Sequence, residues 1–122
     1  MLARLGVVPH TYLLEVRGVR SGSLRTVLVT LVENGDRYVV APYGQRAWVR
    51  NVRADPKGRL IKGRGTADVR LEELGTDESP PVLQRYWQQV KGTRPYFGVG
   101  DNPELDDFRR IAPEHPVFRV IG

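Results

Sequence analysis

The stretch from Arg25 to Ala41 constrains the fold more than any other part of the sequence. Its first half, Arg25–Glu33, is rich in β-branched residues, which favour extended strands. Asn34-Gly35-Asp36 follows, and an Asn-Gly pair supplies the positive φ angles that a tight hairpin turn needs. Arg37–Ala41 is apolar again and predicts the returning strand. We therefore expect an antiparallel hairpin near the centre of the chain.

The remaining chain predicts more strands and a few short helices. Further strands are expected at Tyr12–Val16, Arg59–Lys62, Gly65–Leu74 and Val117–Ile121. Amphipathic helices are expected over Gln45–Ala54, from Glu78 to Gly92 and from Asn102 to Ile111, with the tail of another helix over Met1–Pro9. Lys57-Gly58 is expected to be a turn, and Thr93–Gly100 a loop. Mostly antiparallel strands closed by a last strand predict one domain, residues 1–122, with a mainly β fold: a β-barrel with helices packed on it.

Composition excludes several kinds of site. The 122 residues include no cysteine, which excludes disulfides, thiolate chemistry and cysteine-ligated zinc. The two histidines, His10 and His115, are far apart in the chain, so no metal site is expected. No apolar run approaches the ~18 residues that cross a bilayer, and no signal peptide begins the chain, which favours the cytoplasm. Nucleophile-elbow, Walker and HExxH motifs are also missing.

Arg17–Arg25 joins the first strand to the central hairpin and carries three arginines, two glycines and two serines in nine residues. Its glycines allow close backbone approach to a ligand, and its amides and serine hydroxyls could form an anion nest. Arginine adds two-pronged donation to phosphate or carboxylate. The net charge of +5 and a pI near 10.0 also suit an anionic partner. The loop predicts a clamp for a phosphate or a polyanion, and the alternative is a solvated connection.

Two further stretches are expected to complete one site with this loop. Ala41-Pro42-Tyr43-Gly44 ends a strand and turns into a helix that carries Trp48, Arg50 and Asn51. The start of a helix attracts anions, and Arg46 beside it adds a second positive charge. Trp48 is expected either in the core or as a flat wall against a ring system. Tyr86 and Trp87 fall at helical spacing and are expected in the core.

The ordered set of motifs from Arg17 to Pro56 resembles the deazaflavin-dependent nitroreductase family, within the flavin/deazaflavin oxidoreductases. The pattern is a Gly/Arg/Ser loop, an arginine, a strand hairpin, a glycine-containing turn, and Trp-x-x-Asn on a helix. RPYFGV and HPVFRVI near the C-terminus are similar to a shorter branch of the family. The sequence departs from the family pattern at Val19, Leu28 and Tyr43.

The resemblance implies a split β-barrel of the FMN-binding type and coenzyme F420, a deazaflavin with a phosphate and an oligoglutamate tail. It places Arg20, Ser21, Gly22 and Arg25 at the phosphate and tail, and Ala41, Pro42, Tyr43 and Gly44 beside the cofactor. Thr26, Trp48, Arg50 and Asn51 complete the expected cofactor-binding set, and Tyr96 is the candidate catalytic tyrosine near the substrate. The implied reaction is hydride transfer from the reduced deazaflavin to a small organic acceptor: a quinone, a nitro compound or an enone.

Two alternatives stay open from the sequence. One is a related split barrel that binds FMN or another flavin. The other is a non-enzymatic basic barrel that binds nucleic acid. The arginine loop argues against this alternative, because it lacks the aromatic residues that would stack on bases. We therefore expect a small-molecule acceptor and no nucleic-acid partner, a homodimer as in related split barrels, and leave open a weak association with acidic membrane surfaces.

Overall fold

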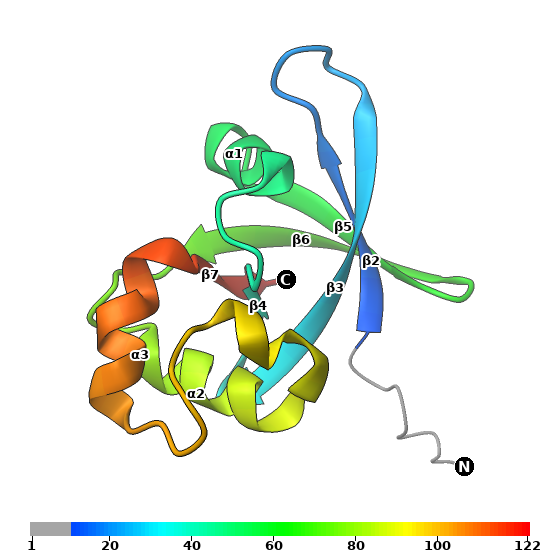
Figure 1. Ribbon diagram of the computed structural model, residues 1–122. Helices are drawn as coiled ribbons and strands as arrows, with labels where there is room; N and C mark the ends of the chain where they lie inside the picture. Colours follow the sequence, from blue (N-terminus) through cyan, green and yellow to red (C-terminus); the bar gives the residue numbers. More distant parts are fainter. Residues whose placement is uncertain (1–10) are drawn as a thin grey trace.

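The computed structural model describes residues 11–122, so the helix tail expected over Met1–Pro9 lies outside the described residues. Within residues 11–122, six antiparallel strands close a barrel in the order β2-β3-β4-β7-β6-β5 (Figure 1). The strands are β2 (Thr11–Arg17), β3 (Leu24–Asn34), β4 (Asp36–Val40), β5 (Lys57–Lys62), β6 (Gly65–Glu73) and β7 (Val117–Ile121). The predicted split-barrel fold class is confirmed.

The central hairpin is confirmed, with β3 and β4 joined through Gly35 at φ 85°. Glycine adopts this left-handed conformation without the steric cost that a Cβ atom brings. The ends of β2 and β3 that carry the arginine loop extend beyond the barrel as an arm (Figure 1). Helix α1 (Ala47–Ala54) lies beside this arm and ends before Pro56, which cannot donate a helical hydrogen bond.

The turn expected at Lys57-Gly58 is wrong, because both residues belong to β5. Gly58 pairs with Val16 of β2, and the two strands approach closely there. A Cβ atom at Gly58 would lie 3.2 Å from Leu14 Cδ1 and 3.3 Å from the Glu15 carbonyl oxygen. The glycine therefore reflects a neighbouring strand rather than a change of chain direction.

Two hydrophobic clusters stabilise the domain, one inside the barrel and one outside it. β4 contributes to both because successive strand residues point to opposite faces: Val39 packs in the barrel, while Tyr38 and Val40 pack under the helices. Full burial of each large apolar side chain contributes roughly 1.5–3 kcal/mol to stability. The outer cluster holds the helical layer against the sheet.

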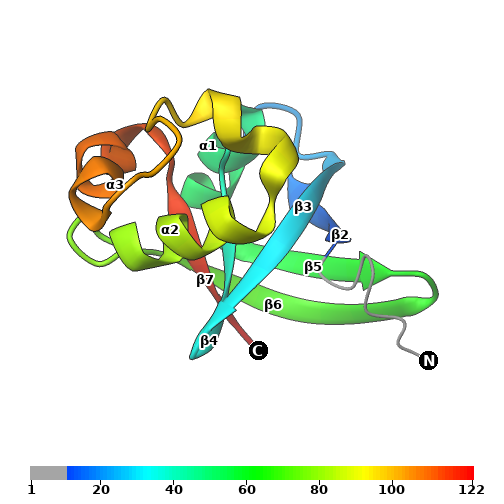
Figure 2. The same cartoon turned by 60° about the horizontal axis from the view of Figure 1, so that its bottom comes forward.

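The helical layer consists of α2 (Pro80–Gln89), α3 (Leu105–Ile111) and two 3-10 segments, η1 (Lys91–Tyr96) and η2 (Ala112–Glu114). Helices α2 and α3 lie side by side on one side of the barrel in both ribbon views (Figures 1 and 2). The loop expected from Thr93 begins instead as η1, which continues directly from α2 and brings Thr93 over the barrel end. No helix within residues 11–122 is long and apolar enough to cross a membrane.

Candidate functional site

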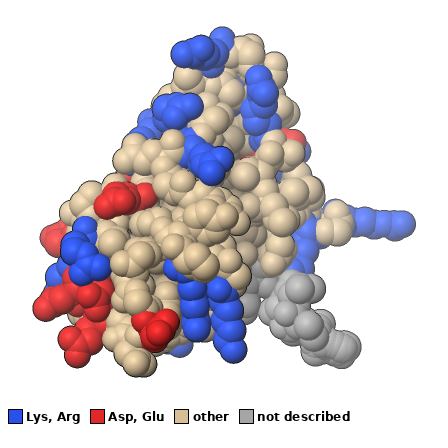
Figure 3. Space-filling model, in the orientation of Figure 1, with Lys and Arg blue, Asp and Glu red and all other residues tan. Residues whose placement is uncertain are grey.

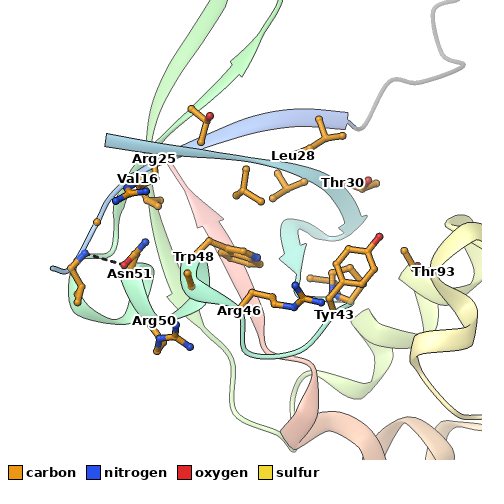
Figure 4. Close-up of a pocket in the computed structure, with 18 of the residues that line it drawn as sticks. Val16, Arg25, Leu28, Thr30, Tyr43, Arg46, Trp48, Arg50, Asn51 and Thr93 are labelled. Atoms are coloured by element: carbon orange, nitrogen blue, oxygen red, sulfur yellow. Dashed lines mark hydrogen bonds between the residues drawn. The ribbon is translucent and has the colours of Figure 1, made fainter. Parts of the chain in front are cut away.

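A cavity of about 870 Å³ lies between the β2–β3 arm, helix α1 and the junction of α2 with η1 (Figure 4). Nine of the predicted cofactor-binding residues line it. They are Arg20, Ser21, Arg25, Thr26, Pro42, Tyr43, Trp48, Arg50 and Asn51. The structure therefore brings together most of the residues that the sequence singled out, from three separate stretches of the chain.

The arginine loop is folded by its own hydrogen bonds. The Gly18 N–H donates to the Ser23 carbonyl at 2.7 Å, and the Gly22 N–H to the Gly18 carbonyl at 2.9 Å. The Ser23 N–H donates to Ser21 Oγ at 3.1 Å, and Arg17 Nη1 donates to the Gly22 carbonyl at 2.5 Å. Gly22 itself does not line the cavity; its φ of 72° closes the turn.

The anion nest that the loop's composition suggested is not formed by these amides, because the protein already uses them. The Val19 N–H is occupied as well, since it donates to Asn51 Oδ1 at 3.0 Å (dashed in Figure 4). Asn51 thus ties the loop to helix α1 across 32 residues of sequence. The arginine side chains and the Ser21 hydroxyl remain as donors for an anion at this end.

Four arginines line the cavity: Arg20, Arg25, Arg46 and Arg50. Neither an Asp nor a Glu lines it, and no carboxylate within residues 11–122 forms an ion pair with any of the four. Helix α1 begins beside Arg46 and has no acidic residue in its first turn, so its dipole adds to the positive potential. Lys and Arg side chains lie over the arm, and Asp and Glu side chains gather at the lower left, near α3 (Figure 3).

Between the arginine loop and the helical layer the cavity walls are largely apolar, although Arg46 also lies there, beside Tyr43 (Figure 4). Val16, Val27 and Val29 come from the arm, and Trp48 from α1. Trp48 packs at the edge of the barrel core, 5.7 Å from the Phe118 ring, and it also lines the cavity; a role against a ring system stays a prediction.

The far end of the cavity carries hydroxyl groups from the helical layer. Tyr86 of α2 and Thr93 of η1 both line the cavity and are joined by a side-chain hydrogen bond. Burial raises the pKa of the Tyr86 phenol. Sequence reasoning placed Tyr86 only in the core, and it is buried there, but the same side chain borders the cavity. No local motif marks Thr93, because α2 and η1 meet the arm only through the tertiary fold.

Besides Gly22, three predicted residues do not line this cavity. Ala41 is buried; its N–H donates to the Pro116 carbonyl at 2.9 Å, and its own carbonyl accepts from His115 Nδ1 at 3.0 Å. Gly44 and Tyr96 line a smaller recess of about 370 Å³ that shares Pro42 and Tyr43 with the main cavity.

Tyr43 connects the two spaces through an aromatic contact. Its ring meets that of Tyr96 edge-on with centroids 4.8 Å apart, and the Arg46 guanidinium lies 5.7 Å from the Tyr43 centroid. Tyr96, the expected catalytic residue, is therefore in contact with the cavity lining rather than part of it.

Solved structures with a similar fold extend across almost the whole chain. A protein of unknown function from Agrobacterium tumefaciens, Atu2129, is 19% identical with a TM-score of 0.67, over 91% of this chain and 47% of that one. This chain thus spans about half the length of that relative. An F420-H2 dependent reductase (FDR-A) is 20% identical with a TM-score of 0.62, over 90% of this chain and 92% of the other.

A third similar structure, an FAD-binding protein from Mesorhizobium loti, is 18% identical with a TM-score of 0.55, over 92% of this chain and 80% of that one. At these identities the likeness shows the fold alone. A search of functionally curated proteins finds no match.

A family model gives the stronger result. The model of the F420H(2)-dependent quinone reductases matches residues 2–102, a range that includes the arginine loop, the central hairpin, α1, α2 and η1. It favours coenzyme F420 over the FMN that the sequence left open. The chain belongs to the F420H(2)-dependent quinone reductase family of oxidoreductases.

Proposed function

We propose that this F420-dependent oxidoreductase reduces quinones, with nitro compounds and enones as the further acceptor classes to compare. One observation carries the proposal: a single cavity joins arginines that have no carboxylate partner within residues 11–122 to a largely apolar, tryptophan-lined interior. The acidic tail of the cofactor needs positively charged partners, and the flat ring attached to it needs apolar walls in the same cavity.

The chain's own residues fit the cofactor at the arginine end. Arg20, Arg25 and Arg50 would hold the phosphate and the carboxylates of its tail through charge-assisted hydrogen bonds. The Ser21 hydroxyl adds a neutral donor, and Gly22 lets the loop turn sharply enough to present all of them. Asn51 keeps the loop in place from the side of α1.

Reduced F420, when bound, supplies a hydride, that is, a proton with two electrons. The protein's part is to orient the reacting molecules and to exclude water. Trp48 and the valines of the arm form the flat, dry walls against which planar rings can lie. Thr26, Pro42 and Tyr43 border the same space, and the Tyr43–Tyr96 contact lies between it and the smaller recess.

We also propose that two copies associate. Leu13 and Leu28 lie directly opposite each other on β2 and β3, and they are 41% and 67% exposed. Neighbouring apolar side chains left in water favour burial against a partner. One of the similar structures is described as a domain-swapped dimer. Light scattering should give twice the mass of the chain, and Leu28→Glu should return it to the single mass.

The first test is a titration of purified protein with F420, followed by the cofactor's own fluorescence. We expect a saturable change at micromolar protein, and then oxidation of reduced F420 on addition of a soluble naphthoquinone. A duplex DNA oligonucleotide serves as the competing polyanion. Absence of saturable F420 binding, or binding that the DNA abolishes at equal charge concentration, would contradict the proposal and favour the nucleic-acid alternative.

A further inference from the structure

The end of the cavity away from the arginine loop holds a polar group that the cofactor's acidic tail does not need. Tyr86 is only 3% exposed, yet it lines the cavity together with Thr93, which is also buried. A buried hydroxyl needs hydrogen-bond partners, because burying it without them costs free energy. Beside a ligand-binding space, such a hydroxyl can form a hydrogen bond with the ligand.

The Tyr86 ring is fixed in position by stacking. Its centroid lies 5.9 Å from that of Phe97 with an interplanar angle of 17°. Phe97 in turn stacks on His115 at 4.5 Å and 6°. Helix α2 holds the backbone of Tyr86, so neither the ring nor its hydroxyl can move far from the cavity wall.

The hydroxyl group has freedom that the ring lacks. Thr93 Oγ1 lies 3.3 Å from the Val90 carbonyl, to which it donates, and it shares a hydrogen bond with the Tyr86 hydroxyl. A hydroxyl donates one hydrogen bond, accepts others, and rotates to suit its partners. Thr93 can therefore donate to Tyr86 once its single proton turns away from the Val90 carbonyl, and Tyr86 can then turn its own proton toward a ligand. A phenol is protonated at neutral pH, and burial raises the Tyr86 pKa further, so the hydroxyl remains a donor.

We propose that Tyr86, supported by Thr93, is a catalytic residue that donates a hydrogen bond to the carbonyl oxygen of the acceptor. This inference rests on the proposed function. In the reaction the acceptor gains a hydride with its two electrons, a pair of its π electrons moves onto the carbonyl oxygen, and a proton from water then neutralises that oxygen. The cofactor loses the same two electrons. A donor fixed where negative charge develops stabilises the transition state more than the ground state.

Tyr86→Phe tests the inference because it removes the hydroxyl and keeps the stacked ring. We expect kcat/KM for a soluble naphthoquinone to fall about tenfold or more, the size typical of one lost hydrogen bond. Calorimetry without F420 should show naphthoquinone binding weakened several-fold, whereas the Kd for F420 should stay within about twofold. Thr93→Val should give a smaller loss in the same direction.

Tyr38→Phe is the matched control. Tyr38 is another buried tyrosine of the outer cluster, but its hydroxyl bonds to Arg119 and it lines neither space described above. We expect wild-type kinetics from it. Full activity in Tyr86→Phe, or a weakened Kd for F420 with unchanged naphthoquinone binding, would overturn the inference. If the wild-type protein binds no F420, that result contradicts the proposed function, and with it this inference, before any variant is compared.

Discussion

The four arginines that line the cavity differ in their surroundings from five arginines elsewhere in the protein. Outside the cavity, five arginines form ion pairs. They are Arg53 with Glu73, Arg59 with Asp68, Arg109 with Asp106, Arg110 with Asp107, and Arg119 with Asp36 and Glu72. The four at the cavity have no carboxylate partner within residues 11–122. Uncompensated like charges repel each other, so their grouping does not stabilise the folded chain but would stabilise an anion bound among them.

The comparison predicts the largest effect from Arg25→Ala. Removing this guanidinium should weaken F420 binding by ~1–3 kcal/mol, through loss of a charge-assisted contact, with no loss of thermal stability. Fluorescence titration and a melting curve measure the two quantities. Arg59→Ala, which removes a paired and exposed arginine, is the control and should leave the Kd unchanged. Equal Kd values for F420 in the two variants would show that the cavity arginines and the ion-paired arginines do not differ in their contribution to binding.

Asn51→Ala should have the next largest effect, because it deletes the acceptor for the Val19 N–H without touching any charge. Loss of this hydrogen bond leaves the loop less fixed, and we expect F420 to bind about fivefold more weakly. Hydrogen exchange at the Val19 amide should also speed up. Asn102→Ala, at an exposed site between η1 and α3, controls for a general effect of losing an amide. An unchanged exchange rate would show that Asn51 does not hold the loop.

Arg53→Ala should reverse the pattern expected at the cavity. Arg53 donates from Nε and Nη2 to the two carboxylate oxygens of Glu73, both at 2.8 Å, and from Nη1 to Gln45 Oε1 at 2.9 Å. Both partners are about one-third exposed, so solvent screens the pair, and we expect a loss of about 0.5–1 kcal/mol in the free energy of unfolding. Urea unfolding measures it. A lowered affinity for F420 with unchanged stability would contradict the division into two groups.

The smallest effect is expected at Asp107, on the acidic side of the molecule. Hydrogen bonds from the Glu104 N–H and from Arg110 lower the pKa of the Asp107 carboxyl. A lowered folded-state pKa means that the stabilising contribution is present above the ordinary pKa of an aspartate and is lost as pH falls through the lowered value. Asp107→Asn should therefore unfold more easily than wild type at pH 6, and this difference should shrink at pH 3. If wild type and Asp107→Asn differ in stability by the same amount at both pH values, the charge of the Asp107 carboxylate is not the cause of the difference.

The sequence predicted the features whose causes are local. Asn34-Gly35 and the β-branched strand before it specify the central hairpin within a few residues, and the arginine loop is continuous in the chain. The features that the sequence did not predict depend on contacts with residues distant in the chain. Gly58 is a glycine because β2 lies against it, and Tyr86 faces a ligand space only because α2 and η1 cover the barrel end. A periodic pattern reports burial but does not report what lies on the other side of the buried side chain.

The hydrogen bonds that close the arginine loop on itself have a consequence for how fast a ligand can be captured. With Gly18, Gly22 and Ser23 already bonded within the loop, the backbone is preorganised and little conformational entropy remains to be lost on association. A rigid, positively charged entrance also attracts anions from a distance. Association should accordingly be rapid and slow down with added salt, while the lifetime of the complex is governed by the apolar interior.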